Sequence, residues 1–253
     1  MNSALVRALL VRGMLAGLAA GLLAFGPAYW IGEPQVNAAI AFEEAHAHGH
    51  GGEELVSRAA QSTGGLLTAV LVFGTAVGGI GALAFCFALG RIGRFGPRAT
   101  AALLAAAAFA AVCLVPSLKY PANPPAVGAP DTLGRRTALY FLLVALTVLL
   151  ALAATLLGRR LAPRLGNWNA TVVAVVSFCV VIGAALAFLP AVNEIPRDFP
   201  AVVVWRFRLA SIGIQALLWA AFGVFFGYLA ERAVRSRTAG LPRNVRPIVP
   251  TGG

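Results

Sequence analysis

Charged residues are scarce in this chain. Only 11% of its 253 residues are Asp, Glu, Lys or Arg, whereas 59% are hydrophobic and the mean hydropathy is +0.83. Soluble domains carry about 25% charged residues, so this chain has fewer than half the charges that a soluble surface needs. The composition therefore favours an integral membrane protein.

Cysteine and lysine are also rare. The three cysteines, Cys86, Cys113 and Cys179, lie in apolar runs without CxxC spacing, so we expect no disulfide framework. Nineteen of the twenty cations are arginine, and the net charge is +11. Such a charge would suggest nucleic acid in a soluble protein. Here the arginines form short clusters between apolar runs, which is how membrane topology is set, and we expect no nucleic-acid partner.

Motifs of enzymes and ATPases are absent. The chain has no G-x-x-x-x-G-K-[S/T] sequence, which excludes nucleotide binding by a P-loop. No nucleophile constellation and no intramembrane His/Asp pair is present, so we expect no catalytic residue and no enzyme.

Six long runs contain no charged residue, and each has between 20 and 32 residues. A helix of about 20 residues crosses the hydrocarbon core of a membrane. The sequence thus predicts an all-α integral membrane protein, a six-transmembrane-helix bundle within residues 1–232, followed by a basic, disordered cytoplasmic tail at 233–253. The expected spans are approximately 10–31, 63–89, 99–117, 137–158, 168–190 and 209–230.

The charges of the connecting segments alternate in sign. Thirteen of the twenty cations fall on one side of the predicted membrane, and eight of the nine acidic residues fall on the other. By the positive-inside rule, both termini are expected in the cytoplasm of a multi-pass protein.

An alternative topology has five helices. The segment Ala39-Ile40-Ala41 resembles a signal-peptidase site, whose cleavage would remove the first span. Against cleavage, Gly13, Gly17 and Gly21 have the spacing of closely packed membrane helices. The pairs Gly74/Gly78 and Gly223/Gly227 repeat that spacing, so we expect tight helix contacts there too.

The predicted external loop 33–61 contains all three histidines of the protein. In an extended segment His46, His48 and His50 would point to one side, and in a helix His46 and His50 would share a face with Glu43. Together with Glu44, these side chains are candidate ligands for Co²⁺, Ni²⁺, Zn²⁺ or Cu²⁺. We expect the ion to be a substrate, with no permanently bound cofactor.

The second and third external loops resemble each other, because each follows a helix with prolines and ends at an arginine pair. With Pro27…Glu33-Pro34 as a degenerate copy, they suggest three parallel helix-hairpin repeats. Polar residues in and below these loops are candidates for a transport path: Asn123, Asn193, Glu194, Asp198, Ser211 and Gln215. We expect Lys119, Arg206 and Arg208 to pair with the acids or to anchor in headgroups.

Several segments resemble the family of predicted cobalt transporter subunits called CbtA. They are the His/Glu-bearing first loop, Lys119–Gly128 with the sequence KYPANPPAVG, Arg136-Thr137, and Asn193–Pro200 leading to Trp205-Arg206-x-Arg208-x-x-Ser211-x-x-x-Gln215. The resemblance covers roughly residues 5–232. It implies a bacterial inner-membrane protein that imports cobalt for cobalamin synthesis with a small single-span, His-rich partner, CbtB. The family is described with five spans, whereas the charge alternation here predicts six.

Two functions are therefore expected. The first is a subunit of a divalent-metal importer, for cobalt above nickel or zinc, that captures the ion with its His/Glu loop and passes it through the bundle. The alternative is a metal-binding scaffold or sensor that delivers ions to a partner without transporting them. We expect the chain to be embedded in a lipid bilayer, and the sequence leaves open whether it forms a homo-oligomer.

Overall fold

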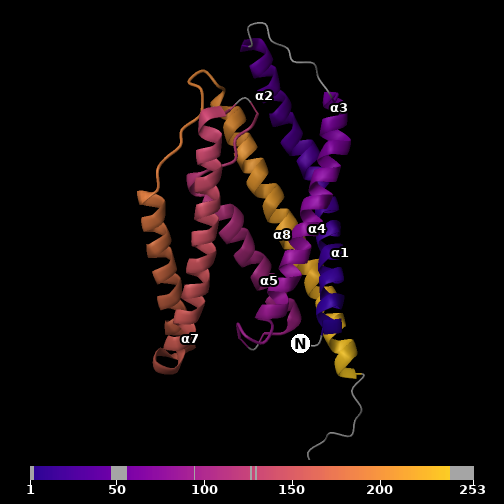
Figure 1. Cartoon of the computed structure of the whole chain (residues 1–253), viewed down its shortest axis with the longest axis vertical. Helices are drawn as coiled ribbons and strands as arrows, with labels where there is room; N and C mark the ends of the chain where they lie inside the picture. The colour runs from indigo at the N-terminus through magenta and orange to yellow at the C-terminus, as the bar shows by residue number, and fades with distance from the viewer. Residues whose placement is uncertain (1–2, 47–55, 94, 126, 129, 240–253) are drawn as a thin grey trace, which may run out of the picture.

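The chain is helical throughout most of its length. The structure is a computed structural model that describes residues 3–46, 56–93, 95–125, 127–128 and 130–239, and the described part contains no β-strand, so the all-α prediction is confirmed (Figure 1). Its elements, of which η denotes π-helical turns, are α1 Ser3–Pro27, η1 Ala28–Gly32, α2 Glu33–His46, α3 Arg58–Ala60, η2 Gln61–Gly65, α4 Leu66–Ala88, α5 Pro97–Ala108, η3 Phe109–Leu114, α6 Val115–Lys119, α7 Pro130–Phe188 and α8 Ala201–Ala239.

Five helices within the described residues are long and apolar enough to cross a membrane. They are Ser3–His46, Arg58–Ala88, Pro97–Lys119, Asp131–Phe188 and Ala201–Ser236. These are the helices of a multi-pass membrane protein, as the composition predicted. The division of the chain into six crossings stays a prediction.

The fourth of these helices, α7, is folded back on itself at Gly166. That residue has φ 73° and ψ 162°, a left-handed conformation that glycine adopts without steric cost. The two arms, 130–165 and 167–188, run side by side and turn at the lower end of Figure 1. Leu143 and Ile182 pack in one buried cluster between them. The predicted spans 137–158 and 168–190 fall on separate arms.

Glycines allow two helix pairs to approach closely. A Cβ atom on Gly13, Gly17 or Gly21 of α1 would overlap with backbone atoms of α4, and Gly17 lies directly against Gly74. A Cβ on Gly223 of α8 would come within 2.9 Å of the Ala105 side chain on α5. The close packing predicted from glycine spacing is therefore confirmed.

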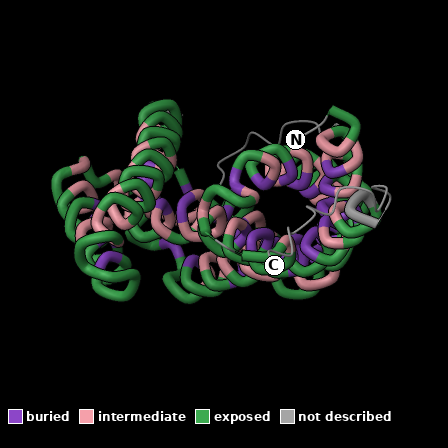
Figure 2. Tube along the Cα trace, turned by 90° about the horizontal axis from the view of Figure 1, so that it is seen from below, coloured by how far each residue is buried: buried purple, intermediate pink, exposed green. Residues whose placement is uncertain are grey.

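The core lies among α1, α4, α5 and α8, while the α7 hairpin lies to one side. Phe85, Phe222 and Phe226 form the aromatic centre of this core, with Leu9 and Trp219 beside them. Seen from the lower end in Figure 2, the buried residues gather mainly in this group of helices. Only 11% of the apolar window of α7 is buried, against 39% for α1 and α8, so the hairpin is peripheral.

Two of the π-helical segments end two residues before a proline. The segment η1 ends at Gly32, ahead of Pro34, and η3 ends at Leu114, ahead of Pro116. A proline has no N–H and its ring crowds the carbonyl four residues earlier, so the widened π turn relieves the clash without ending the helix.

The first predicted external loop therefore begins as a helix. Residues 33–46 continue from α1 through η1 as α2, where we expected a loop from residue 33. Alanine and glutamate, both good helix formers, make up half of this stretch and no glycine lies between Gly32 and Gly49, which explains the continuation. The described chain resumes at residue 56.

The connecting segments of the chain separate into two ends. The helices α2 and α3 and the segments 120–128 and 189–200 lie at the upper end of Figure 1. The start of α1, the turn 89–93, the turn between the two arms of α7 and the last turns of α8 lie at the lower end. The described residues that were predicted to handle metal belong to the upper end or to the part of α8 below it.

Candidate metal-handling site at the upper end

The C-terminal end of α2 brings His46 against Asp198. The imidazole Nε2 lies 3.9 Å from the Asp198 carboxylate, and Nδ1 lies 2.8 Å from the backbone carbonyl of Phe42. Because a carbonyl only accepts hydrogen bonds, Nδ1 must carry the proton, and Nε2 of the neutral ring keeps its lone pair free. The two side chains are 54% and 68% exposed, so solvent reaches this pair.

A small apolar cluster holds α2 in this position. The Phe42 ring stacks on His46 at 4.1 Å and meets Phe199 edge to face at 4.8 Å between ring centroids. Phe199 is buried together with Ala39 and Val127. Aromatic pairs of this kind contribute about 0.5–1.5 kcal/mol beyond their buried area, so the contact fixes α2 to the segment 189–200.

The structure does not bring the other predicted ligands of the first loop together with His46 in one described group. Glu43 and Glu44 are exposed on α2. His48 and His50 lie outside the described residues. Among the residues that the structure describes, no group of three or more His, Cys, Asp or Glu side chains is assembled. Their roles as metal ligands stay predictions.

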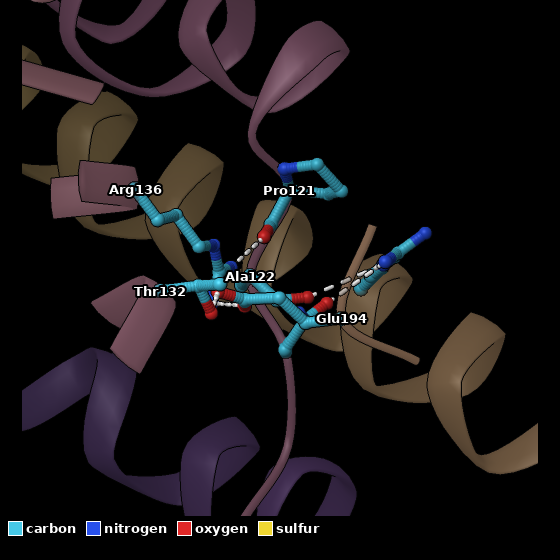
Figure 3. Close-up of polar contacts among 7 residues, drawn as sticks. Pro121, Ala122, Thr132, Arg136 and Glu194 are labelled. Atoms are coloured by element: carbon cyan, nitrogen blue, oxygen red, sulfur yellow. Dashed lines mark hydrogen bonds and ion pairs between the residues drawn. The ribbon is translucent and has the colours of Figure 1, made fainter. Parts of the chain in front are cut away.

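The side chain of Glu194, one of the predicted path residues, is only 2% exposed. It accepts a hydrogen bond from the Thr132 hydroxyl and forms an ion pair of 3.2 Å with Arg136 (Figure 3). The same guanidinium donates a second hydrogen bond, to the carbonyl of Pro121. Arg136 therefore joins the two proline-rich segments at the start of α7.

Asn123 is held in a similar way by Arg208 of α8. The guanidinium donates from Nη2 to the Asn123 side-chain oxygen at 2.8 Å and from Nε to the carbonyl of Ala122 at 3.3 Å. Two neighbouring carbonyls of one segment are thus bound by arginines from two different helices. Asn193, another predicted path residue, is exposed beside Glu194.

Tyr120 adds a further link between the two proline-rich segments. Its hydroxyl donates to the carbonyl of Pro190 at 2.8 Å, and the residue is 3% exposed. Burial raises the pKa of the Tyr120 hydroxyl above its usual value, and the charge of Arg135 offsets part of that rise. The hydroxyl therefore stays protonated and keeps its bond through neutral and mildly alkaline pH.

A cavity of about 380 Å³ lies below these contacts, between η3–α6, the start of α7 and α8. Its walls contain both arginines, Arg136 and Arg208, and the predicted path residues Ser211 and Gln215. The cavity thus brings together Ser211 and Gln215, whose place on a transport path stays a prediction, whereas two guanidiniums in its wall were not expected.

Sequence reasoning assigned the cations of this region differently. We expected Lys119, Arg206 and Arg208 to pair with the acids or to anchor in headgroups. The described ion pair to Glu194 comes instead from Arg136, and Arg208 donates to Asn123 and Ala122. Arg206 is exposed on α8. Arg136 lies less than two turns into a helix that follows a proline-rich loop, and helical side chains point back toward the start of their helix, which was the signal for its role.

The comparison with family models gives one match, to the family described as "Probable cobalt transporter subunit (CbtA)", over residues 6–231. The chain belongs to this family. Neither the curated proteins nor the solved structures give a match. The CbtA match covers His46, Glu194, Arg136, Arg208 and Gln215, and it leaves the basic C-terminal segment outside. Membership in CbtA makes the chain a subunit of a probable transporter, which implies a partner and a membrane.

Proposed function

We propose that this chain captures a divalent transition-metal ion at its upper end and passes it inward as the membrane subunit of an importer. Cobalt is the expected ion, given the family, and nickel and zinc suit the same ligands. The observation that carries the proposal is the geometry of His46, whose ring is oriented by Phe42 with its free nitrogen toward Asp198.

Metal-binding histidines donate their second ring N–H to a carbonyl or carboxylate, which fixes the tautomer and the direction of the free lone pair. His46 has this arrangement already. Two ligand atoms that each lie about 2.1 Å from one ion are about 3.0–4.2 Å apart for ligand angles between 90° and 180°. The 3.9 Å between His46 and Asp198 falls in this interval. Glu43, Glu44, His48 and His50 would supply the remaining ligands.

Passage below the capture site would use the oxygen atoms of Asn123 and Glu194 and then Ser211 and Gln215. In the described conformation Arg136 and Arg208 occupy the first two of these. An incoming ion would have to exchange with the guanidiniums, so we propose that the two arginines gate the path.

The orientation and the number of crossings belong to the same proposal. The arginines of the lower end, from Arg7 to Arg235, would face the cytoplasm of a bacterium and the acidic upper end would face outward across the inner membrane. The hairpin of α7 would supply two of six crossings, because each arm is long enough for one. A small single-span subunit with a His-rich end, CbtB, is the proposed partner, and assembly of several copies is compatible with this scheme.

One observation favours the alternative function, a scaffold or sensor that hands the ion to a partner. The cavity below the capture site has two guanidiniums in its wall, and the Glu194 carboxylate beside one of them is already paired with it. That charge repels a bare divalent cation. In this alternative the ion would be bound at His46 and would leave through the partner.

Uptake and binding measured together distinguish the two functions. We would measure Co²⁺ and Ni²⁺ uptake by cells expressing the intact chain or a His46/His48/His50→Ala variant, each with and without the small subunit, and Co²⁺ binding to the purified proteins. Arg197→Gln is the matched control, because Arg197 is an exposed neighbour of Asp198 without ligand chemistry.

The importer predicts uptake that is lost in the triple variant and kept in the control. The scaffold predicts Co²⁺ binding that is lost in the same variant, with no uptake by the intact chain in any combination. Binding and uptake that are both unchanged in the triple variant would contradict the capture site itself.

A further inference from the structure

The cavity at the top of the bundle has an excess of positive charge. Its wall contains Arg136 and Arg208, and the carboxylate of Glu194 neutralises Arg136. Arg208 donates only to neutral oxygens, those of Ala122 and Asn123, and no ion pair to it is found in the described chain. A guanidinium that is half-buried without a counter-ion is costly, so the cavity is suited to a negatively charged group.

The helix α8 lines the cavity with polar side chains along one face. Arg208, Ser211 and Gln215 are spaced at i, i+3 and i+7, so they lie on the same side of the helix. The side-chain oxygen of Gln215 is buried and has no hydrogen-bond partner among the described residues. An unpaired buried acceptor costs about 1–3 kcal/mol. The site therefore offers a charged donor at one end and an unsatisfied acceptor at the other.

The cavity also borders the surface that faces lipid. Leu133 and Phe141, both on the first arm of α7, line it and are 60% and 62% exposed. A cavity with exposed apolar side chains at its mouth can admit a ligand from the bilayer. The apolar tail of the ligand remains between these side chains while its polar head enters the cavity.

We propose that this cavity binds a phosphate group, and that the phosphate belongs to the headgroup of a membrane phospholipid. Arg208 supplies the charge and Ser211 a hydroxyl to the phosphate oxygens. A headgroup hydroxyl or ammonium, as in glycerol or ethanolamine lipids, donates a hydrogen bond to the side-chain oxygen of Gln215. The volume of about 380 Å³ is ample for such a headgroup but not for a whole phospholipid, so the acyl chains lie outside, against Leu133 and Phe141.

The test uses the full chain, purified and delipidated, with lipids added back and retained lipid measured by native mass spectrometry. Glycerol, ethanolamine and choline phospholipids are compared with inorganic phosphate at equal concentration, each together with a thermal-unfolding measurement. Arg206→Gln is the matched control, because Arg206 lies two residues away on the same helix and is exposed outside the cavity.

We expect retention of glycerol and ethanolamine lipids to fall at least tenfold in Arg208→Gln and to be unchanged in Arg206→Gln. Choline lipid, which has no headgroup donor, should be retained less well by the intact chain. If inorganic phosphate stabilises the chain as much as the lipids do, the cavity is a phosphate site, but its ligand is the free ion and the assignment to a phospholipid is wrong.

Arg208→Gln also loses the contacts to Ala122 and Asn123, so the variant can fail to fold. Ser211→Ala and Gln215→Leu leave those contacts in place and address the same cavity. Equal lipid retention by the intact chain, Ser211→Ala and Gln215→Leu, with no effect of phosphate, would overturn the proposal.

Discussion

Gly17 of α1 lies against Gly74 of α4 so closely that a Cβ atom on either residue would overlap with the carbonyl oxygen of the other. Helices in lipid have little hydrophobic attraction for one another, so close van der Waals contact through small residues is what holds them together. The pairing of the first two apolar helices depends on this contact.

Replacing Gly17 with Val should therefore weaken the bundle. Overpacking costs about 1–3 kcal/mol in ordinary cores, and we expect the upper end of that range because backbone atoms must move. The measurement is the midpoint of thermal unfolding in detergent. Gly213→Val is the control, since a Cβ on Gly213 meets nothing within 4 Å. Equal midpoints for the two variants would argue against the contact.

Glu194→Gln should be strongly destabilising. The substitution removes the charge that neutralises Arg136 at a position where the carboxylate is 2% exposed. Breaking one partner of a buried ion pair costs about 3–5 kcal/mol. Adding Arg136→Met should recover much of the loss, because no uncompensated charge remains. Thermal unfolding of Glu194→Gln, of Arg136→Met and of the double variant gives the coupling free energy between the two side chains.

The ion pair between Arg235 and Glu231 provides the comparison. Arg235 is 78% exposed, and exposed pairs contribute about 0–1 kcal/mol. Arg235→Gln should thus change the midpoint little. A loss as large as that of Glu194→Gln would show that burial is not what distinguishes the two pairs.

Tyr140→Phe should loosen the helix formed by α5, η3 and α6 at its π-helical turn. Pro116 has no N–H for the carbonyl of Val112, four residues before it, and the Tyr140 hydroxyl donates to that carbonyl at 2.8 Å. Removing the donor leaves an acceptor unpaired at a cost of about 1–3 kcal/mol. Hydrogen exchange of residues 112–118 should accelerate. Tyr228→Phe is the control, because the Tyr228 ring contacts Arg98 and Arg232 by its face.

Co²⁺ binding to the intact chain should weaken as the external pH falls from about 7 to about 5.5. A histidine must be neutral to bind a metal, and free histidine side chains take up a proton near pH 6.5. Affinity is therefore full above this interval and is lost as the pH falls through it. Titration calorimetry at several pH values checks the direction, and a flat profile would exclude histidine ligands.

The apolar helices and their close contacts were predictable because both depend on local composition. Runs without charge indicated the apolar helices, and the spacing of Gly13, Gly17 and Gly21 indicated a packed face. The two ends of the molecule followed from the alternation of charge along the chain, which requires no knowledge of how the helices are arranged.

The polar contacts at the upper end were not predictable in the same way. Arg136, Thr132 and Glu194 come from two segments about 60 residues apart, and their meeting depends on the fold-back of α7 at Gly166, which returns the chain to the same end. The helical start of the first loop was missed because the first span was ended where its charge-free run stops, before Glu33. A charged residue ends an apolar run but does not end a helix, and α2 begins at Glu33.

The unbroken helix from Ser3 to His46 has a consequence for how cargo arrives. At 1.5 Å per residue it is about 66 Å long, roughly twice the thickness of a hydrocarbon core. The fourteen residues of α2 alone extend about 20 Å. An ion bound at His46 would stand clear of the headgroup layer, where a bulky chelator or a carrier protein can dock and release it. Selection among metals would then take place by direct exchange in the aqueous compartment, before any ion meets the electric field of the bilayer.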